Sequence, residues 1–251
     1  MTHRKLLIDA DLLCHMQTAA AEHPFRWESD LWTLHSDPKE AMASTAQHIE
    51  RLMADLEADS VELAWNDLEG GNFRKDLDPL YKGNRANTRK PLAFKEVREW
   101  LMQEFSSWAR PGLEGDDVLG ILATHPKLAK ADEKIIVSGD KDLLTIPGLH
   151  HSSEGLIEVS VEEADYNFLH QTLTGDKTDG YPGCPGIGPK TADAKLAERC
   201  DWDKVVAVYE SKGLGETEAL HQARLARILR ASDYDFKAKA PILWSPRIDD
   251  E

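Results

Sequence analysis

The sequence predicts an α/β fold whose central sheet is mostly parallel and carries helices on both faces. Three apolar segments of strand length, residues 5–9, 61–65 and 135–138, alternate with longer segments that favour helix. Strands joined through helices in this way usually run parallel. After these segments the pattern becomes helical and is interrupted by Gly and Pro. We therefore expect a core over residues 1–180 and a packed helical subdomain over residues 181–251.

The helices are predicted from their start signals and from the breaks between them. Residues 12–22 follow the first strand as a helix, and Asp37 with Pro38 starts a second one that runs to about residue 55. Further helices are predicted at 91–108, 115–124 and 160–173, the last with a Ser-x-x-Glu capping box. We expect irregular structure at 27–35 and another strand at 156–159.

Composition places the chain among soluble cytoplasmic proteins. Of the 251 residues 41% are hydrophobic, yet no apolar run reaches the roughly 18 residues that span a bilayer. The three cysteines lack CxxC spacing, which argues against disulfides and a zinc site. The net charge of −15 is unusual for a nucleic-acid binder. Residues 72–98 nevertheless carry eight Lys and Arg against three acids, a pattern that a solvated basic helix would also give.

Acidic residues follow each of the three predicted strands: Asp9 and Asp11, then Asp67, then Asp140 and Asp142. Ligands of open parallel sheets bind beyond the carboxyl ends of the strands, so we expect these side chains to lie close together. Five more acids follow helix boundaries: Glu114, Asp116, Asp117, Asp176 and Asp179. Clustered carboxylates repel one another unless they hold hard cations such as Mg²⁺, Mn²⁺ or Ca²⁺. Each acid taken alone is more readily explained by a turn or a helix cap, and Asp11 is expected to point away from Asp9.

A glycine-rich stretch at residues 183–192 is the second strong signal. Gly186-Ile187-Gly188 permits a tight loop that aims backbone N–H groups and a helix N-terminus at phosphate oxygens, and Lys190 adds charge. The spacing is not that of a P-loop. A hairpin that merely packs two helices together would use similar glycines.

Five segments in order resemble the flap endonuclease and 5′-nuclease superfamily, and the likeness is greatest to the compact 5′→3′ exonucleases of short-tailed bacteriophages. They are Leu-Ile-Asp at residues 7–9, Tyr-Lys-Gly-Asn-Arg at 81–85, Glu-Gly-Asp-Asp at 114–117, Ser-Gly-Asp-Lys-Asp at 138–142, and Gly-Asp-x-x-Asp at 175–179 leading into the glycine-rich hairpin. The resemblance covers nearly the whole chain. It implies a PIN/5′-nuclease-like core, a helical arch over about residues 72–110, and a C-terminal helix–hairpin–helix region.

The resemblance also implies two metal sites. The first would take Asp9, Asp67, Glu114 and Asp116 with Asp117 nearby, and the second Asp140, Asp142, Asp176 and Asp179. Two or more Mg²⁺ ions, replaceable by Mn²⁺, would act in hydrolysis, one lowering the pKa of a water and one stabilising the leaving 3′-oxygen. The chain departs from the family at Gly180, where cellular members carry Asn, and at Ala10, where Gly is common. Neither position is a ligand.

Basic residues and the hairpin receive their roles from the same resemblance. Lys82 and Arg85 match catalytic residues at the base of the arch, and the hairpin matches a segment that grips duplex and holds K⁺. The residues expected to contact DNA are Arg74, Tyr81, Arg89, Lys90, Gly186, Gly188, Lys190 and Thr191. The implied protein is a cytoplasmic monomer that cuts DNA at a 5′ end or junction, with flaps and RNA–DNA hybrid as further substrates.

Two alternatives remain open at the level of sequence. A non-catalytic DNA-binding protein would keep the hairpin but would not need the full set of carboxylates. A PIN-like ribonuclease would keep the acidic sheet edge but would normally lack the Gly-Ile-Gly-Pro-Lys hairpin.

Overall fold

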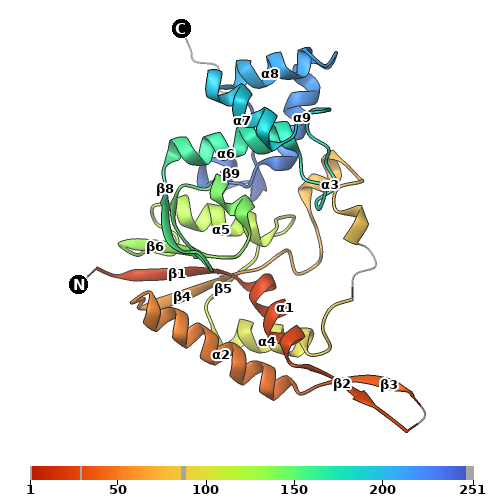
Figure 1. Cartoon of the computed structure of the whole chain (residues 1–251). Helices are drawn as coiled ribbons and strands as arrows, with labels where there is room; N and C mark the ends of the chain where they lie inside the picture. The colour runs from red at the N-terminus through yellow and green to blue at the C-terminus, as the bar shows by residue number, and fades with distance from the viewer. Residues whose placement is uncertain (1, 29, 86–88, 247–251) are drawn as a thin grey trace.

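The central sheet has six strands in the order β5-β4-β1-β6-β7-β8. The computed structural model describes residues 2–28, 30–85 and 89–246, and of Arg85 only the backbone. The strands are β1 (Arg4–Asp9), β4 (Ser60–Ala64), β5 (Ser107–Trp108), β6 (Glu133–Val137), β7 (Gly148–Ser152) and β8 (Gly155–Val159). All neighbours pair in parallel except β8, which is antiparallel to β7. The predicted mostly parallel α/β sheet is confirmed (Figure 1).

Helices cover both faces of the sheet because side chains alternate along its central strand. Leu6 and Ile8 pack with α1 (Ala10–Ala20), α2 (Pro38–Asp55) and α4 (Phe94–Glu104) in one core. On the opposite face, a second core joins Leu7 to α5 (Gly115–Thr124). The chain enters α2 through the predicted cap, in which the Asp37 carboxylate accepts a hydrogen bond from Lys39 N.

The C-terminal helices form a third core beside the sheet. The helices are α6 (Val161–Thr174), α7 (Pro189–Glu198), α8 (Trp202–Glu210) and α9 (Glu216–Ala226). Phe168, Val205 and Ala223 pack together there, so α6 joins the sheet region to the later helices. The chain then returns to α5 through Ile228 and Leu229, the turn η3 (Ala231–Asp233), and the short pair β9 (Tyr234–Asp235) and β10 (Ala240–Pro241).

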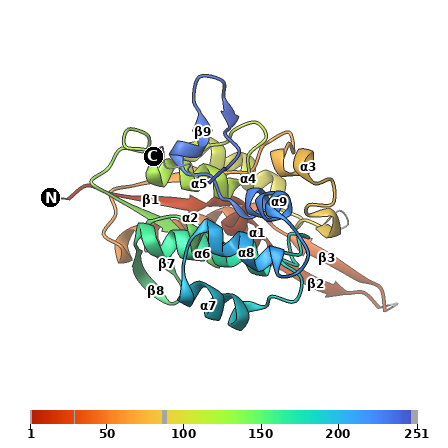
Figure 2. The same cartoon turned by 90° about the horizontal axis from the view of Figure 1, so that it is seen from above.

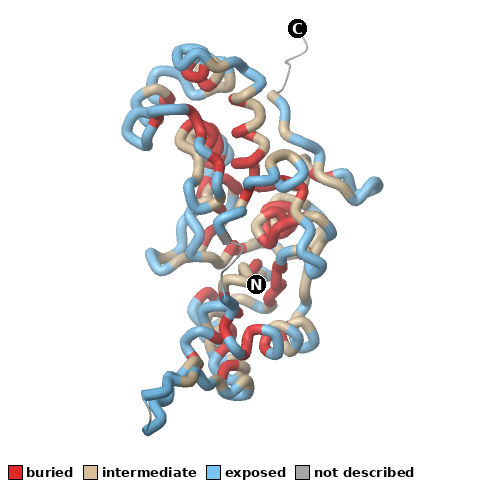
Figure 3. Tube along the Cα trace, turned by 90° about the vertical axis from the view of Figure 1, so that its right-hand side faces the viewer, coloured by how far each residue is buried: buried red, intermediate tan, exposed pale blue. Residues whose placement is uncertain are grey.

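Three details of the secondary structure differ from the prediction. Residues 32–35, within a segment expected to be irregular, lie in β3 (Trp32–Ser36), which pairs with β2 (Glu22–Arg26) in an antiparallel hairpin that projects from the body (Figure 2) and is mostly exposed (Figure 3). The hairpin lacks a glycine-based turn signal, and cross-strand pairs hold it instead. The helix predicted at 91–108 spans only α4, because β5 completes the hydrogen bonding of the β4 edge. Strand β7 was not predicted from the sequence.

The segment assigned to a helical arch divides into two parts. Its second part is α4, which packs into the core through Phe94, Val97 and Leu101 and therefore cannot form an arch. Its first part contains the short helix α3 (Phe73–Leu77) and the turn η1 (Gly83–Arg85). Residues 86–88 lie outside the described part. Within the described residues, no helix is long and apolar enough to cross a membrane.

Candidate active site

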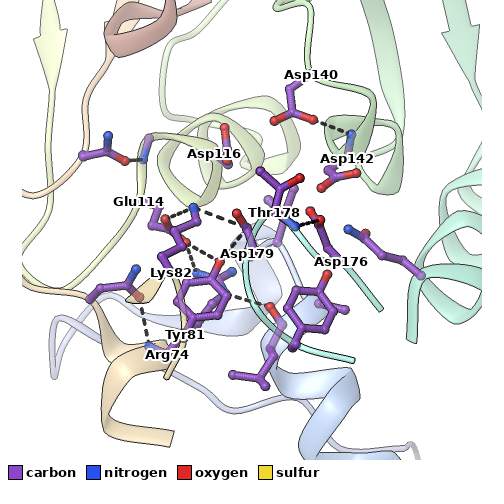
Figure 4. A pocket seen from close by; sticks show the side chains of 18 of the residues that line it. Arg74, Tyr81, Lys82, Glu114, Asp116, Asp140, Asp142, Asp176, Thr178 and Asp179 are labelled. Atoms are coloured by element: carbon purple, nitrogen blue, oxygen red, sulfur yellow. Dashed lines mark hydrogen bonds and ion pairs between the residues drawn. The ribbon is translucent and has the colours of Figure 1, made fainter. Parts of the chain in front are cut away.

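A cleft of about 1270 Å³ opens where β1, β4 and β6 end. It gathers eight of the nine predicted metal-ligating acids from five separate segments of the chain. These are Asp9, Asp67, Glu114, Asp116, Asp140, Asp142, Asp176 and Asp179. Figure 4 labels Glu114, Asp116, Asp140, Asp142, Asp176 and Asp179 among them. The parallel topology therefore brings the strand-end acids together, as their positions in the sequence predicted.

Several of these acids also organise the local backbone. Asp9 caps α1 by accepting a hydrogen bond from Leu12 N at 3.1 Å, and Asp140 accepts one from Asp142 N at 2.9 Å. Asp67 accepts hydrogen bonds from the backbone N–H groups of Gly112, Gly71 and Glu69, and the bond from Gly112 contributes most to lowering its pKa. These acids therefore do serve as caps and turn residues, and the same side chains also line the cleft.

The loop that carries Asp176 and Asp179 is fixed by two glycines. Gly175 and Gly183 both adopt positive φ and lie back to back, so that a Cβ on Gly175 would come within 2.4 Å of Gly183 N. Only glycine tolerates both conditions. Between them, Asp176 N donates to Tyr181 O at 2.9 Å, and Thr178 N donates to the Asp176 carboxylate. The two aspartates are thereby held at the cleft.

On one side of the cleft the acids contact cations. Glu114 is ion-paired with Arg74 at 3.1 Å and with Lys82, and Lys82 also lies 3.4 Å from Asp179. Burial alone would raise the pKa of Glu114, but the charges of Arg74 and Lys82 outweigh it and hold that pKa below its ordinary value. We call Glu114 and Asp179 the cation-paired side.

On the other side, acids face acids. Burial, with the charges of Asp11 and Asp140, raises the pKa of Asp9 to about 6. Burial and the charges of Asp140 and Asp176 raise the pKa of Asp142 to about 6, and burial beside Asp9 raises that of Asp116 strongly. We call Asp9, Asp116 and Asp142 the acid-only side, because burial and neighbouring acids outweigh the charge of Lys82, which lowers the pKa of Asp116. Electrostatic strain of this kind is typical of a cation site.

The acids do not form a finished metal cage. Among the described residues, no three acidic, histidine or cysteine side chains are close enough to enclose one ion. The donors are nevertheless carboxylate oxygens, which suit Mg²⁺. Mg²⁺ commonly binds through one or two carboxylates and completes its shell with water and substrate phosphate. The residues present therefore fit such an ion.

Three predicted site residues have other partners in the structure. Asp117 is fully buried, and its two oxygens accept hydrogen bonds from Arg74, Glu114 N and Leu229 N, which leaves it unsuited as a metal ligand. Arg74 and Tyr81 are 2% and 3% exposed, so the predicted contacts with DNA are wrong for this conformation. The sequence could not show that α3 carries Arg74 under the cleft, or that Tyr81 packs into the C-terminal core and donates to Glu114.

The remaining predicted residues are distributed around the cleft. Lys82 and Lys90 line it, whereas Arg89 makes a bidentate ion pair with Glu22 at 2.7 and 2.8 Å. The side chain of Arg85 lies outside the described part. In the hairpin, buried Ile187 anchors the loop, while four predicted contact residues are exposed: Gly186, Gly188, Lys190 and Thr191.

Sequence reasoning also missed three polar residues that support the acids. Asn66 accepts a hydrogen bond from Gly115 N at 2.8 Å and donates its own N–H to Asp11, so it joins the end of β4 to the start of α5. The Ser138 hydroxyl donates to Asp9 at 3.2 Å, and Gln171 hydrogen-bonds Asp142. Asn66 directly follows one predicted strand and Ser138 is the last residue of another, positions that could have revealed them.

The parallel sheet and the acid-lined cleft at its carboxyl edge define a nuclease with a resolvase-like core. Residues 4–163 match the family described as 5′-3′ exonuclease, N-terminal resolvase-like domain, and the chain belongs to this family. It is a hydrolase of phosphodiester bonds, as the resemblance implied.

Relatives match along almost the whole chain. The exodeoxyribonuclease of Enterobacteria phage T3 is 32% identical and the exonuclease of Escherichia phage T7 is 31% identical, each over 96% of this chain and 93% of its own length. A flap endonuclease of bacteriophage T5, solved as a pseudo-enzyme–product complex with DNA and metal ions, superposes with a TM-score of 0.65. At 17% identity over 89% of both chains, that likeness supports the fold.

Proposed function

We propose that this protein is a divalent-metal-dependent 5′→3′ exonuclease that hydrolyses duplex DNA to products with 5′-phosphates. The observation that carries the proposal is the convergence of eight carboxylates on one cleft, with raised pKa values on its acid-only side. Without cations this arrangement destabilises the fold, so a role in binding them accounts for its presence. The exodeoxyribonuclease relative and the solved complex with DNA and metal ions support DNA as substrate.

The acids would hold Mg²⁺, with Mn²⁺ as a substitute, in two groups. Asp9, Asp67, Glu114 and Asp116 form one group, and Asp140, Asp142, Asp176 and Asp179 form the other. Bound divalent ions would lower the pKa of the attacking water and neutralise charge on the phosphate and the leaving oxygen in a two-metal mechanism. Asp117 is omitted because its oxygens are fully engaged inside the protein.

The chain's own cations would act on the phosphate. Lys82 lies between Glu114 and Asp179, at the wall of the cleft where a scissile phosphate would meet the acids. Its ammonium would offset the charge that builds on the phosphoryl oxygens, and Arg85 is proposed to share this task. Lys90, further along the same cleft, would contact the strand that leaves it.

Residues 181–251 would hold the duplex while residues 1–180 cut it. The exposed Gly186 and Gly188 lead into α7, and the exposed Lys190 and Thr191 lie in its first turn, so the helix N-terminus there favours a backbone phosphate. We assign a K⁺ ion to this hairpin and propose that one monomer suffices. A duplex bridging hairpin and cleft would present its 5′ end or junction to the acids.

The test is digestion of end-labelled substrates with Mg²⁺ and with EDTA. Linear and nicked duplexes should be shortened from 5′ ends to 5′-phosphorylated products, while covalently closed circles should survive. Parallel 5′-flap and RNA–DNA hybrid substrates measure the further activities. Degradation from 3′ ends, rapid cutting of closed circles, or a strong preference for single-stranded RNA would overturn the proposal, and the last would favour the PIN-like ribonuclease.

A further inference from the structure

Arg74 makes contacts that no motif predicts. It lies on α3 beneath the cleft, with its guanidinium buried. Its Nη1 and Nη2 donate to the two oxygens of Asp117 at 2.8 and 2.7 Å, and Nη1 also donates to Glu114 Oε2 at 3.1 Å. The planar fork of an arginine satisfies this two-carboxylate arrangement, which the single ammonium of a lysine cannot reproduce.

The guanidinium of Arg74 also determines how the two carboxylate oxygens of Glu114 are oriented. Oε2 accepts from Arg74 and from the Tyr81 hydroxyl at 2.9 Å, so it is turned into the protein. Oε1 instead accepts a hydrogen bond from Lys82 Nζ, and Lys82 and Glu114 both line the cleft. Asp117 completes the arrangement, because one of its oxygens accepts a hydrogen bond from Glu114 N at 3.1 Å and so fixes the start of α5.

Arg74 also reaches the C-terminal part of the chain. Its Nε donates to Leu225 O at 3.0 Å, at the end of α9, and Nη2 donates to Arg227 O. Leu229 N in turn donates to Asp117 at 3.1 Å. One buried side chain thus joins α3, the start of α5 and the exit from α9, three segments far apart in the sequence.

We propose that Arg74 is a positioning residue: by holding Oε2 of Glu114, it leaves Oε1 as the oxygen that binds a divalent cation. Because Arg74 also bonds Leu225 O and Arg227 O, it fixes this orientation of Glu114 relative to the end of α9. The inference rests on Glu114 being a metal ligand, as proposed above. Arg74 itself touches neither cation nor substrate. Substitution of a residue that hydrogen-bonds a metal ligand and orients it commonly lowers metal affinity or activity by about 10- to 100-fold.

The test compares Arg74→Lys with a matched variant, Arg227→Lys. Arg227 is also buried and contacts Asp233 through Nε and Nη2 at 2.8 Å each, but it does not touch a cleft carboxylate. Both variants should lower Tm. Arg74→Lys alone should raise the Mg²⁺ concentration for half-maximal cleavage by about 10- to 100-fold and shrink the rise in Tm that Mg²⁺ gives the DNA-free protein. KM for DNA at saturating Mg²⁺ should stay near that of the wild type.

A second variant separates positioning from folding. Arg74→Met combined with Asp117→Asn removes both charges of the buried pair, and the Asn side-chain oxygen still provides an acceptor for a backbone N–H of Glu114 or Leu229. It should show the same weakened Mg²⁺ response. Wild-type Mg²⁺ dependence in this double variant and in Arg74→Lys, or an equal change in Arg227→Lys, would overturn the inference. A wild type that shows no Mg²⁺-dependent cleavage would instead overturn the proposed function.

Discussion

Glu114 and Asp142 face the same cleft and burial alone would raise both pKa values, yet the pKa of Glu114 is lowered and that of Asp142 is raised. The pKa of Glu114 is held low because Arg74 and Lys82 lie beside it. The pKa of Asp142 rises to about 6 because burial disfavours its charged form and the charges of Asp140 and Asp176 add to that effect. The protein's own cations therefore offset part of the negative charge on the cation-paired side, whereas the acid-only side depends more on an external cation to offset its charge.

This difference gives the two sides different roles in stability. Removing a charge from the acid-only side should relieve repulsion, while removing a cation from the other side should leave a buried carboxylate uncompensated. Activity should fall in both cases. The sign of the change in Tm of the metal-free protein therefore distinguishes the two sides.

The largest effect is expected for Asp142→Asn. Loss of a carboxylate ligand should lower cleavage by about 1000-fold, since metal ions contribute several kcal/mol of transition-state stabilisation. The metal-free protein should melt about 2–4 °C higher, for a gain on the order of 1 kcal/mol. Cleavage assays and thermal melts with EDTA check both. Asp55→Asn, the same change on the exposed face of α2, should alter neither. A lower Tm together with full activity would remove Asp142 from the site.

Lys82→Ala should lower kcat by about 100-fold, because it removes a charge aimed at the phosphate. It should also lower the Tm of the metal-free protein, opposite in sign to Asp142→Asn, since Glu114 loses one of its two ion-pair partners. Single-turnover kinetics and melts measure the two effects, with Lys39→Ala on α2 as the exposed control. If Lys82→Ala weakened DNA binding without changing kcat, Lys82 would be only part of a basic surface.

The stabilisation by Asp142→Asn should depend on pH. The pKa of Asp142 is raised in the folded protein from 3.8 to about 6, so the folded chain holds that proton more tightly than the unfolded chain. The resulting stability is fully present below about pH 4 and is lost as pH rises through about 6. The Tm difference between variant and wild type should therefore be near zero at about pH 4 and largest above about pH 7. A difference that is constant across this range would contradict the raised pKa.

The smallest effect is expected at the hairpin. Lys190→Ala should weaken binding to all duplex sequences by about 3- to 10-fold and reduce the salt dependence by about one phosphate contact. The turnover number should be unchanged, because Lys190 lies outside the cleft lining. Binding isotherms at several salt concentrations test this, with Lys237→Ala as a control at another exposed turn. An unchanged salt slope would exclude a phosphate contact at Lys190.

The sequence determined those features that depend on neighbours along the chain. The strands β1, β4 and β6 follow from short apolar runs, and Asp37 and Ser160 cap α2 and α6 as predicted. Because parallel strands end at one edge, the acids after them could be expected in one place. Motif order then identified the family, which the comparisons confirm.

Only the tertiary structure decided which charges meet. In the sequence, Arg74 is one of several basic residues in a segment expected to bind DNA. In the folded protein it lies under the cleft and donates hydrogen bonds to Asp117, which is 43 residues further along the chain. That contact turns Asp117 from an expected ligand into a buried support, and it separates Glu114 from the acid-only side. Such pairings arise from long-range packing and from the cost of leaving a buried charge without a partner, and neither is visible in local sequence.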